Sequence, residues 1–121
     1  YYGESADMAP ATGYIAPPLD GLWATAPYLH NGSVPDLRSL LDSRLRPDFC
    51  QHRLHPRTYD PTVLGWEYEL LRHGKSAVGE PNAKARVYDL TLPGYGNDGH
   101  LCGDGLTDAE RTAVIECLKT L

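Results

Sequence analysis

The chain has 121 residues, of which 41% are hydrophobic and 22% charged, and its net charge at neutral pH is −5. This length accommodates one domain of ordinary size, and the composition is that of a globular protein rather than a disordered one. The acidic balance disfavours a nucleic-acid partner, and no apolar run approaches the roughly 18–20 residues of a membrane span. We therefore expect no nucleic-acid partner and no membrane span.

The N-terminal residues show no clear hydrophobic period. Residues 1–18 combine small and polar residues with prolines, which predicts an extended arm before a domain that occupies residues 19–121. The chain begins with Tyr1 rather than with an initiator Met. We therefore expect a processed product or a part of a longer protein.

Two short segments near the start of the domain favour helix. An apolar run predicts a helix over residues 19–26, which Pro27 would end because proline disfavours helix at the residue before it. Leucines then recur at helical spacing over residues 34–43, and Ser33 precedes them as a candidate N-cap.

The last helix has the clearest signal. Thr107 and Glu110 have the spacing of a capping box, which predicts a helix over residues 107–120. Apolar residues at helical spacing predict its buried face: Ala113, Val114, Cys117, Leu118 and Leu121.

The middle of the chain carries weaker signals. Residues 57–66 predict two short extended segments around an Asp-Pro turn, and residues 86–90 predict a third. Residues 72–85 are polar and glycine-containing, which predicts a surface excursion. A tight irregular loop over residues 93–99 then leads to His100.

One local cluster has metal-ligand chemistry. Cys50, His52 and His55 lie within six residues, and His73 could supply a fourth ligand to zinc, which favours thiolate and imidazole. The spacing is not that of a zinc finger, and the neighbouring arginine disfavours a second cation. The alternative is a polar loop with surface histidines. The sequence contains no phosphate loop, zincin or nucleophile-elbow motif.

Residues 14–37 carry the most specific signal of function. Within them, residues 24–33 read Ala-Thr-Ala-Pro-Tyr-Leu-His-Asn-Gly-Ser and precede a leucine-rich segment. This stretch closely resembles the one after the second haem-attachment motif in the dihaem cytochrome c family, which includes bacterial cytochrome c peroxidases and a rubber-oxygenase branch. The similarity continues in order through most of the remaining chain, notably at residues 88–94, 96–100 and 105–110.

The resemblance implies a mainly α, cytochrome c-like fold with short helices, long irregular loops and a little β-structure. It implies the haem-binding C-terminal part of a dihaem c-type cytochrome, periplasmic or secreted, with haem c as cofactor and electron transfer with peroxidase- or oxygenase-type chemistry. This chain has no Cys-x-x-Cys-His run for covalent attachment. The remainder of the cytochrome, from the same precursor or another chain, and a redox protein would be the partners. The alternative is a haem-free interaction module.

By the same resemblance, His100 looks like the distal ligand of the C-terminal haem, and His30 like a residue of the pocket wall. A loop imidazole bound to the backbone is the alternative for His100, and a structural turn residue is the alternative for His30. Trp23 and Tyr28 would pack the pocket or the core. The only methionine, Met8, lies in the N-terminal arm, so methionine ligation has little support.

The three cysteines cannot all pair within one chain. The oxidising setting that the resemblance implies, together with the position of Cys102 and Cys117 at either end of the last helix, suggests a disulfide between these two. Such a bridge requires residues 103–105 to fold back beside the helix, since it spans at most about 7 Å between Cα atoms.

Overall fold

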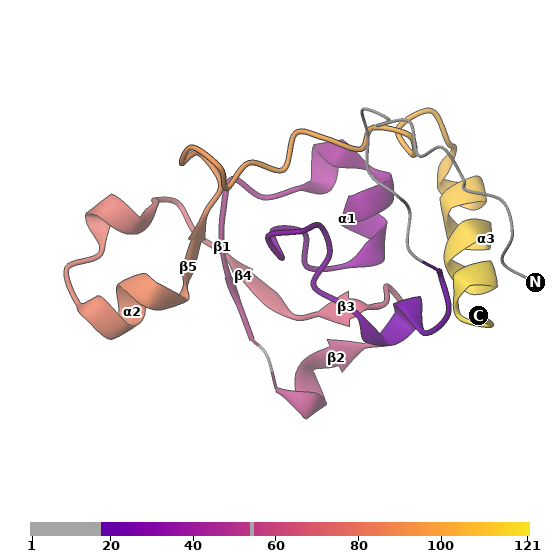
Figure 1. The fold of residues 1–121 in the computed structure, drawn as a ribbon, viewed down its shortest axis with the longest axis horizontal. Coiled ribbons are helices and arrows are strands. Elements are labelled where there is room, and N and C mark those ends of the chain that lie inside the picture. Colours follow the sequence, from indigo (N-terminus) through magenta and orange to yellow (C-terminus); the bar gives the residue numbers. More distant parts are fainter. Residues whose placement is uncertain (1–17, 54) are drawn as a thin grey trace, which may run out of the picture.

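An antiparallel sheet forms the centre of the structure, a computed structural model that describes residues 18–53 and 55–121 (Figure 1). The strand order of this three-stranded sheet is β4-β1-β5, and β2 and β3 form a separate two-stranded sheet. The two longest helices, α2 and α3, lie at opposite ends of the molecule (Figure 1).

The elements are short and follow one another in the order 3₁₀-helix η1 (Leu22–Ala24), α1 (Leu37–Leu41), η2 (Ser43–Leu45), β1 (Phe49–His52), η3 (Pro56–Thr58), β2 (Tyr59–Asp60), β3 (Gly65–Trp66), β4 (Tyr68–Leu70), η4 (Lys75–Ala77), α2 (Pro81–Arg86), β5 (Val87–Asp89) and α3 (Asp108–Leu118). In the described ranges, no helix is long and apolar enough to cross a membrane. The predicted arm, apart from Pro18, lies outside the described residues, so its extended form stays a prediction.

The prediction of a mainly α fold is wrong. Among the described residues, only α3 is longer than six residues, and two antiparallel sheets occupy the middle of the chain. The helix predicted over residues 19–26 shrinks to the single 3₁₀ turn η1, because Gly21 has a left-handed φ of 74° and the chain turns away before Pro27.

The helix predicted over residues 34–43 is also shorter than expected. Ser33 is not its N-cap, because Val34 pairs with Tyr28 in an isolated β-bridge. Asp36 caps α1 instead: its carboxylate accepts a hydrogen bond from the Ser39 N–H at 2.7 Å. Helix α1 ends at Leu41.

The extended segments predicted in the middle of the chain are confirmed. Strands β2 and β3 pair across a turn in which the Asp60 carboxylate accepts from the Thr62 N–H at 2.7 Å, and β5 falls within residues 86–90. Residues 72–85 do lie at the surface for the most part, but they also contain η4 and all of α2 except its last residue. Glu80 caps that helix by accepting from two backbone N–H groups.

The main core lies where the 28–34 turn, α1 and α3 meet. It consists of buried apolar side chains from these segments and from the β2–β3 turn: Tyr28, Val34, Leu37, Leu64 and Ile115. The capping box that starts α3 is confirmed, since Thr107 and Glu110 each accept from the other's backbone N–H. The predicted apolar face of α3 is correct only in part: Leu118 packs against the core and Val114 is half-buried, but the other three predicted residues are exposed. The fully buried residues of the helix are Arg111 and Ile115, and the Arg111 guanidinium packs against the end of α1.

Candidate functional site

A tight turn at residues 28–34 presents His30 to solvent. Its ends are joined by two backbone hydrogen bonds between Tyr28 and Val34, at 2.7 and 3.3 Å between N and O. Leu29 and Gly32 both have a φ of 64°, and the Asn31 side chain accepts from the Ser33 N–H at 3.1 Å. These left-handed residues reverse the chain and leave the His30 imidazole exposed.

Tyr28 fixes this turn to the core. Its ring is buried, and its hydroxyl donates a hydrogen bond to the Leu64 carbonyl at 2.8 Å. Burial also raises the pKa of the phenol far above its usual range, so the hydroxyl remains a donor. Trp23, by contrast, is 48% exposed and does not pack in the core.

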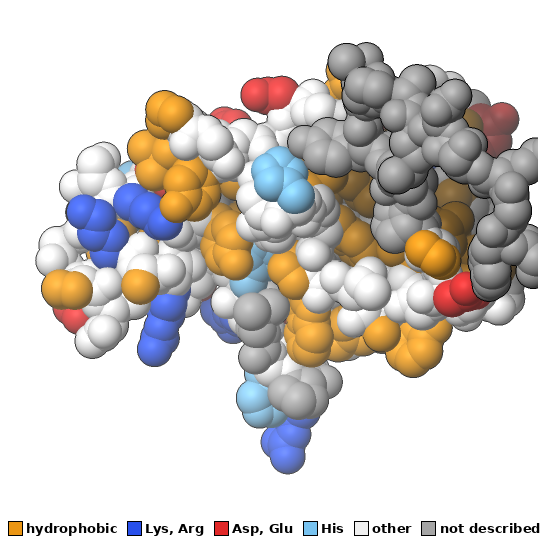
Figure 2. Space-filling model, viewed as in Figure 1, with side chains coloured by type: hydrophobic (Ala, Val, Ile, Leu, Met, Phe, Trp, Pro, Cys, Tyr) orange, Lys and Arg blue, Asp and Glu red, His pale blue; other side chains and the backbone are white. Residues whose placement is uncertain are grey.

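The second histidine of interest, His100, lies on the loop between β5 and α3. It has a left-handed φ of 59° and is exposed. Exposed apolar residues precede and follow it along this loop, namely Leu92, Tyr95 and Leu101. Apolar side chains gather over the part of the loop that follows β5 (Figure 2).

The two histidine-bearing segments are hydrogen-bonded to each other. The Asn31 amide donates to the carbonyls of Tyr95 and Gly96, both at 3.1 Å. Arg46, which follows η2, donates to three further carbonyls of the same loop, the last of them that of His100. The turn with His30 and the loop with His100 therefore form one hydrogen-bonded unit beside α1.

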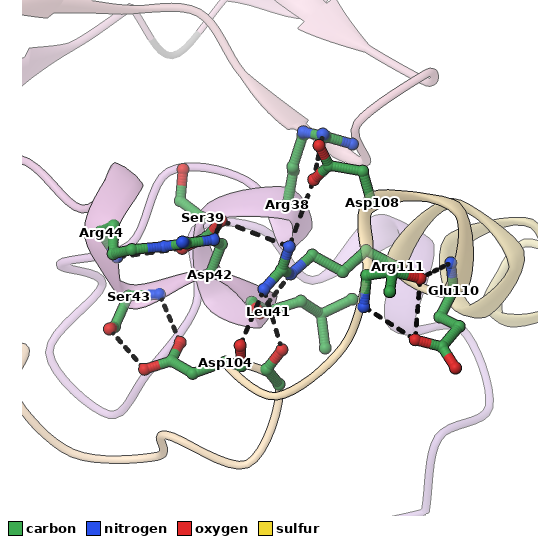
Figure 3. A network of polar contacts seen from close by, with 12 residues as sticks. Arg38, Ser39, Leu41, Asp42, Ser43, Arg44, Asp104, Asp108, Glu110 and Arg111 are labelled. Carbon is green, nitrogen blue, oxygen red and sulfur yellow. Dashed lines mark hydrogen bonds and ion pairs between the residues drawn. The ribbon is translucent and has the colours of Figure 1, made fainter.

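The far end of the loop is fastened by charged side chains (Figure 3). Arg111 of α3 donates to the Leu41 carbonyl at 3.0 Å and to the Asp104 carbonyl at 3.1 Å. The Asp104 carboxylate in turn accepts from the Ser43 N–H at 2.8 Å and from the Ser43 hydroxyl at 2.6 Å. Hydrogen bonds to charged groups of this kind hold a loop more firmly than neutral ones.

Residues 13–51 match the sequence model of the family described as RoxA-like, cytochrome c-like. This segment is similar to cytochrome c-like domains. Its described part contains η1, the turn with His30, α1, η2 and all of β1 except its last residue. The match stops before the loop with His100, which is attached to the cytochrome c-like segment through Asn31 and Arg46.

Two longer bacterial proteins are also similar to the chain. The uncharacterized protein y4iJ of Sinorhizobium fredii (strain NBRC 101917 / NGR234) is 38% identical over 118 residues, which cover 89% of this chain and 18% of that protein. The uncharacterized protein y4iM of the same strain is 37% identical over 89 residues, or 73% of this chain and 19% of its own length. The chain thus spans about a fifth of the length of these curated relatives.

The predicted zinc cluster is not assembled. Cys50 and His52 lie on β1 with 3.9 Å between the Cys50 sulfur and His52 Nε2, but no third described His, Cys, Asp or Glu joins them. Burial raises the pKa of the Cys50 thiol to about 11 and lowers that of His52. His55 instead accepts from the Arg57 N–H at 3.2 Å as the cap of η3. This arrangement favours a neutral pair of a buried thiol and a half-buried imidazole over a cation site.

The predicted disulfide is wrong, since Cys102 and Cys117 are both free and exposed. Residues 103 and 104 lie beside the start of α3 rather than along its length, since their carbonyls accept hydrogen bonds from Arg111 near that end of the helix. Gly103 also packs directly on the Leu41 backbone. The loop is therefore held against the end of α1.

Sequence reasoning found both exposed histidines but missed the residues that fasten them. Asn31 belongs to the sequence stretch that contains His30 but has no role of its own there, and Arg46 belongs to no motif. The backbone carbonyls of a glycine-rich loop need hydrogen-bond donors from elsewhere in the chain. This requirement is the one signal that could have pointed to a donor such as Arg46.

Proposed function

We propose that this chain is the haem-facing C-terminal part of a dihaem c-type cytochrome that transfers electrons. The observation that supports this most directly is the attachment of the loop with His100 to the cytochrome c-like segment, next to the turn with His30. Two exposed imidazoles on adjoining, hydrogen-bonded segments offer ligands to a metal centre that approaches this surface.

The residues of this surface fit one face of a haem. An imidazole is a usual axial ligand of c-type iron, and His100 is exposed on a loop with three glycines among its preceding seven residues, which lets a flat macrocycle approach the backbone. The apolar side chains of Leu92, Tyr95 and Leu101 suit a macrocycle edge. The covalent attachment would come from the remainder of the cytochrome, because this chain carries no Cys-x-x-Cys-His run.

Each residue has a distinct role in this proposal. His100 is the axial ligand, and His30 stands in the pocket wall, with its imidazole as the second candidate ligand. Tyr28 holds the turn that carries His30, and the exposed indole of Trp23 covers apolar surface of the partner portion. A bound haem supplies a reversible one-electron iron couple. Peroxidase- or oxygenase-type chemistry, a periplasmic or secreted location and a redox partner protein are further parts of the proposal.

One observation favours a second function, a haem-free interaction module. The loop after β5 exposes Leu92, Tyr95 and Leu101, and exposed apolar side chains on one loop suit a protein interface as well as a cofactor. In that case the fastened loop would serve as a rigid docking surface rather than as a ligand support.

Absorption and electron paramagnetic resonance spectra of the complete natural protein test the proposal. We expect a Soret band and a low-spin ferric signal, and we expect His100→Ala to convert one haem to a high-spin state. His73→Ala removes another exposed imidazole and is the matched control, with no expected spectral change. A protein without a Soret band favours the interaction module, and an unchanged spectrum in His100→Ala assigns the ligand elsewhere, with His30→Ala as the next variant.

A further inference from the structure

Arg46 joins two segments of the chain through its guanidinium group. This group has five N–H donors, and all five are used on backbone carbonyls. Nε donates to Ser39 at 3.1 Å and Nη2 to Leu40 at 3.0 Å, both in α1. The remaining donors reach the loop between β5 and α3: Nη1 donates to Asn97 at 2.5 Å and to Gly99 at 2.6 Å, and Nη2 donates to His100 at 2.9 Å.

The carbonyls on the α1 side make a firm base. Ser39 and Leu40 belong to the last turn of α1, where carbonyls have no partner within the helix. The first turn of the same helix is capped by the buried Asp36. The guanidinium is therefore fixed to an element that belongs to the main core.

The carbonyls on the loop side define the backbone of His100. The Gly99 carbonyl belongs to the peptide plane before His100, and the His100 carbonyl belongs to the plane after it. Because each peptide unit is planar, bonds to both carbonyls restrict φ and ψ of the residue between them. His100 has a φ of 59°, a left-handed conformation that is uncommon for residues other than glycine and needs support from its surroundings.

We propose that Arg46 is the positioning residue for His100: it holds the His100 backbone in its left-handed conformation and thereby sets the direction in which the imidazole is presented. The functional part of this inference rests on the proposed function, since an axial ligand must be oriented toward its metal. The conformational part of the inference stands on the hydrogen bonds alone. Asn97 adds to the support, because its amide donates to the Pro47 carbonyl at 3.1 Å, next to Arg46.

A lysine could not take over this role. The guanidinium is a rigid plane that reaches carbonyls on two sides, whereas an ammonium is a compact group with three donors on a flexible stem. Arg46→Lys therefore keeps the charge and loses part of the hydrogen bonding. This difference separates positioning by geometry from a purely electrostatic effect.

Limited proteolysis of the complete natural protein tests the conformational part. Thermolysin cleaves before leucine, and Leu101 follows His100 directly, while the exposed Leu70 on β4 gives an internal reference. We expect Arg46→Ala to raise the cleavage rate at Leu101 relative to Leu70 by roughly tenfold or more, because one hydrogen bond to a charged donor changes an equilibrium by about that factor. The cleavage ratio of Arg46→Lys should fall between those of the parent protein and Arg46→Ala. If Arg46→Ala does not fold, the comparison of Arg46→Lys with the parent tests the inference.

The control is Arg44→Ala, which removes a nearby guanidinium whose described hydrogen bonds go to Asp42 and not to the carbonyls around His100. We expect no change in the Leu101 to Leu70 ratio for this variant. An unchanged ratio in Arg46→Ala, or an equal rise in Arg44→Ala, overturns the inference.

Spectra of the haem-loaded protein separate this inference from the proposed function. If both hold, Arg46→Ala gives a partly high-spin signal that added imidazole returns to low spin, while Arg44→Ala keeps the parent spectrum. A loosened loop together with an unchanged spectrum in both Arg46→Ala and His100→Ala supports the positioning of His100 and overturns its role as ligand. If Arg46→Ala keeps the fully low-spin spectrum of the parent protein while His100→Ala becomes high-spin, the positioning role of Arg46 is overturned.

Discussion

Arg111 of α3 and Asp42, which directly follows α1, form a buried ion pair with 3.5 Å between Arg111 Nη1 and Asp42 Oδ2. Their side chains are only 3% and 6% exposed. The same guanidinium donates to the carbonyls of Leu41, Gly103 and Asp104 (Figure 3). One side chain thus joins the end of α1, the end of the loop with His100 and the start of α3.

We expect Arg111→Met to lower the free energy of unfolding by about 3 kcal/mol. The substitution leaves the buried Asp42 carboxylate without this partner and removes the hydrogen-bond donor of several backbone carbonyls. Arg44 still binds Asp42 in this variant, so the loss of stability should be smaller than for a buried carboxylate with no remaining partner. Arg38→Met is the control. It removes an exposed pair with Asp108 and should cost less than about 1 kcal/mol. Urea denaturation measures both, and equal losses would contradict a special role for Arg111.

Acid should weaken this cluster. The hydrogen bonds from Arg44, with the nearby charge of Arg111, hold the pKa of Asp42 at about 2, below the ordinary value of about 3.9 in the unfolded chain. A lowered pKa contributes stability that is complete above the unfolded value and is lost as the pH falls through the folded one. We therefore expect the Tm to fall between about pH 4.5 and pH 2, with a shallower fall in Asp42→Asn.

The matched control for this pH series is Asp98→Asn. Asp98 is exposed and forms no ion pair in the part of the chain that the structure describes. Thermal melts across the same pH range should give the parent slope for this variant. An Asp42→Asn slope as steep as the parent's would mean that other carboxylates carry the acid sensitivity.

Local signals were sufficient for α3 and for the β2–β3 turn. A capping box operates within four residues, and the Asp60 turn within three, so the residues that decide each structure are visible side by side in the sequence. Strands β1 and β4 had no such signal. They pair residues as distant as Cys50 and Leu70, and each is too short to show an alternating pattern.

The candidate site was predictable only in part. His30 and His100 stood out because motif resemblance marks the residues themselves. The attachment of these histidines depends on hydrogen bonds from Asn31 and Arg46 to backbone carbonyls more than fifty residues away. Every residue has a backbone carbonyl whatever its side chain, so the sequence does not mark which ones accept these bonds. Arg111 was hidden for a related reason: a charged residue on a helix is expected at the surface until a buried partner is known.

The cysteines differ in accessibility, which chemical modification should reveal. Cys50 is fully buried with a pKa raised to about 11, while Cys102 and Cys117 are exposed. We expect iodoacetamide at pH 8 to modify two thiols in the native protein purified without reductant, and all three after denaturation. If Cys102 and Cys117 react only after reduction, they form the disulfide that the structure does not contain.

The start of α3 offers a direct test of local capping. Thr107→Ala removes the hydroxyl that accepts from the Glu110 N–H, and we expect it to lower the free energy of unfolding by roughly 0.5–2 kcal/mol. Thr112→Ala is the matched control, since its hydroxyl only donates to the Asp108 carbonyl inside the helix. Chemical denaturation should show a clear loss for the first variant and little change for the second. Similar values for both would mean that the cap does not hold α3 in place.

The close approach of the loop to α1 can be tested with two glycines that lie two residues apart. A Cβ at position 103 would collide with the backbone of Leu41, whereas a Cβ at position 105 would meet nothing within 4 Å. We expect Gly103→Ala to cost about 1–3 kcal/mol, as overpacking of a closed contact does. Gly105→Ala should be neutral or stabilise by roughly 0.4–1 kcal/mol, because alanine restricts the unfolded chain.

Both glycine variants change one methyl group and leave the charge untouched, so their difference reports the loop–helix contact itself. The measurement is the urea midpoint of each variant together with the thermolysin cleavage rate before Leu101. Gly103→Ala should lower the midpoint and speed the cleavage, because the loop must move away from Leu41 to admit the methyl group. If Gly103→Ala matches Gly105→Ala in both measurements, the loop does not rest on α1, and the hydrogen bonds from Arg111 to Gly103 and Asp104 could not hold it there either.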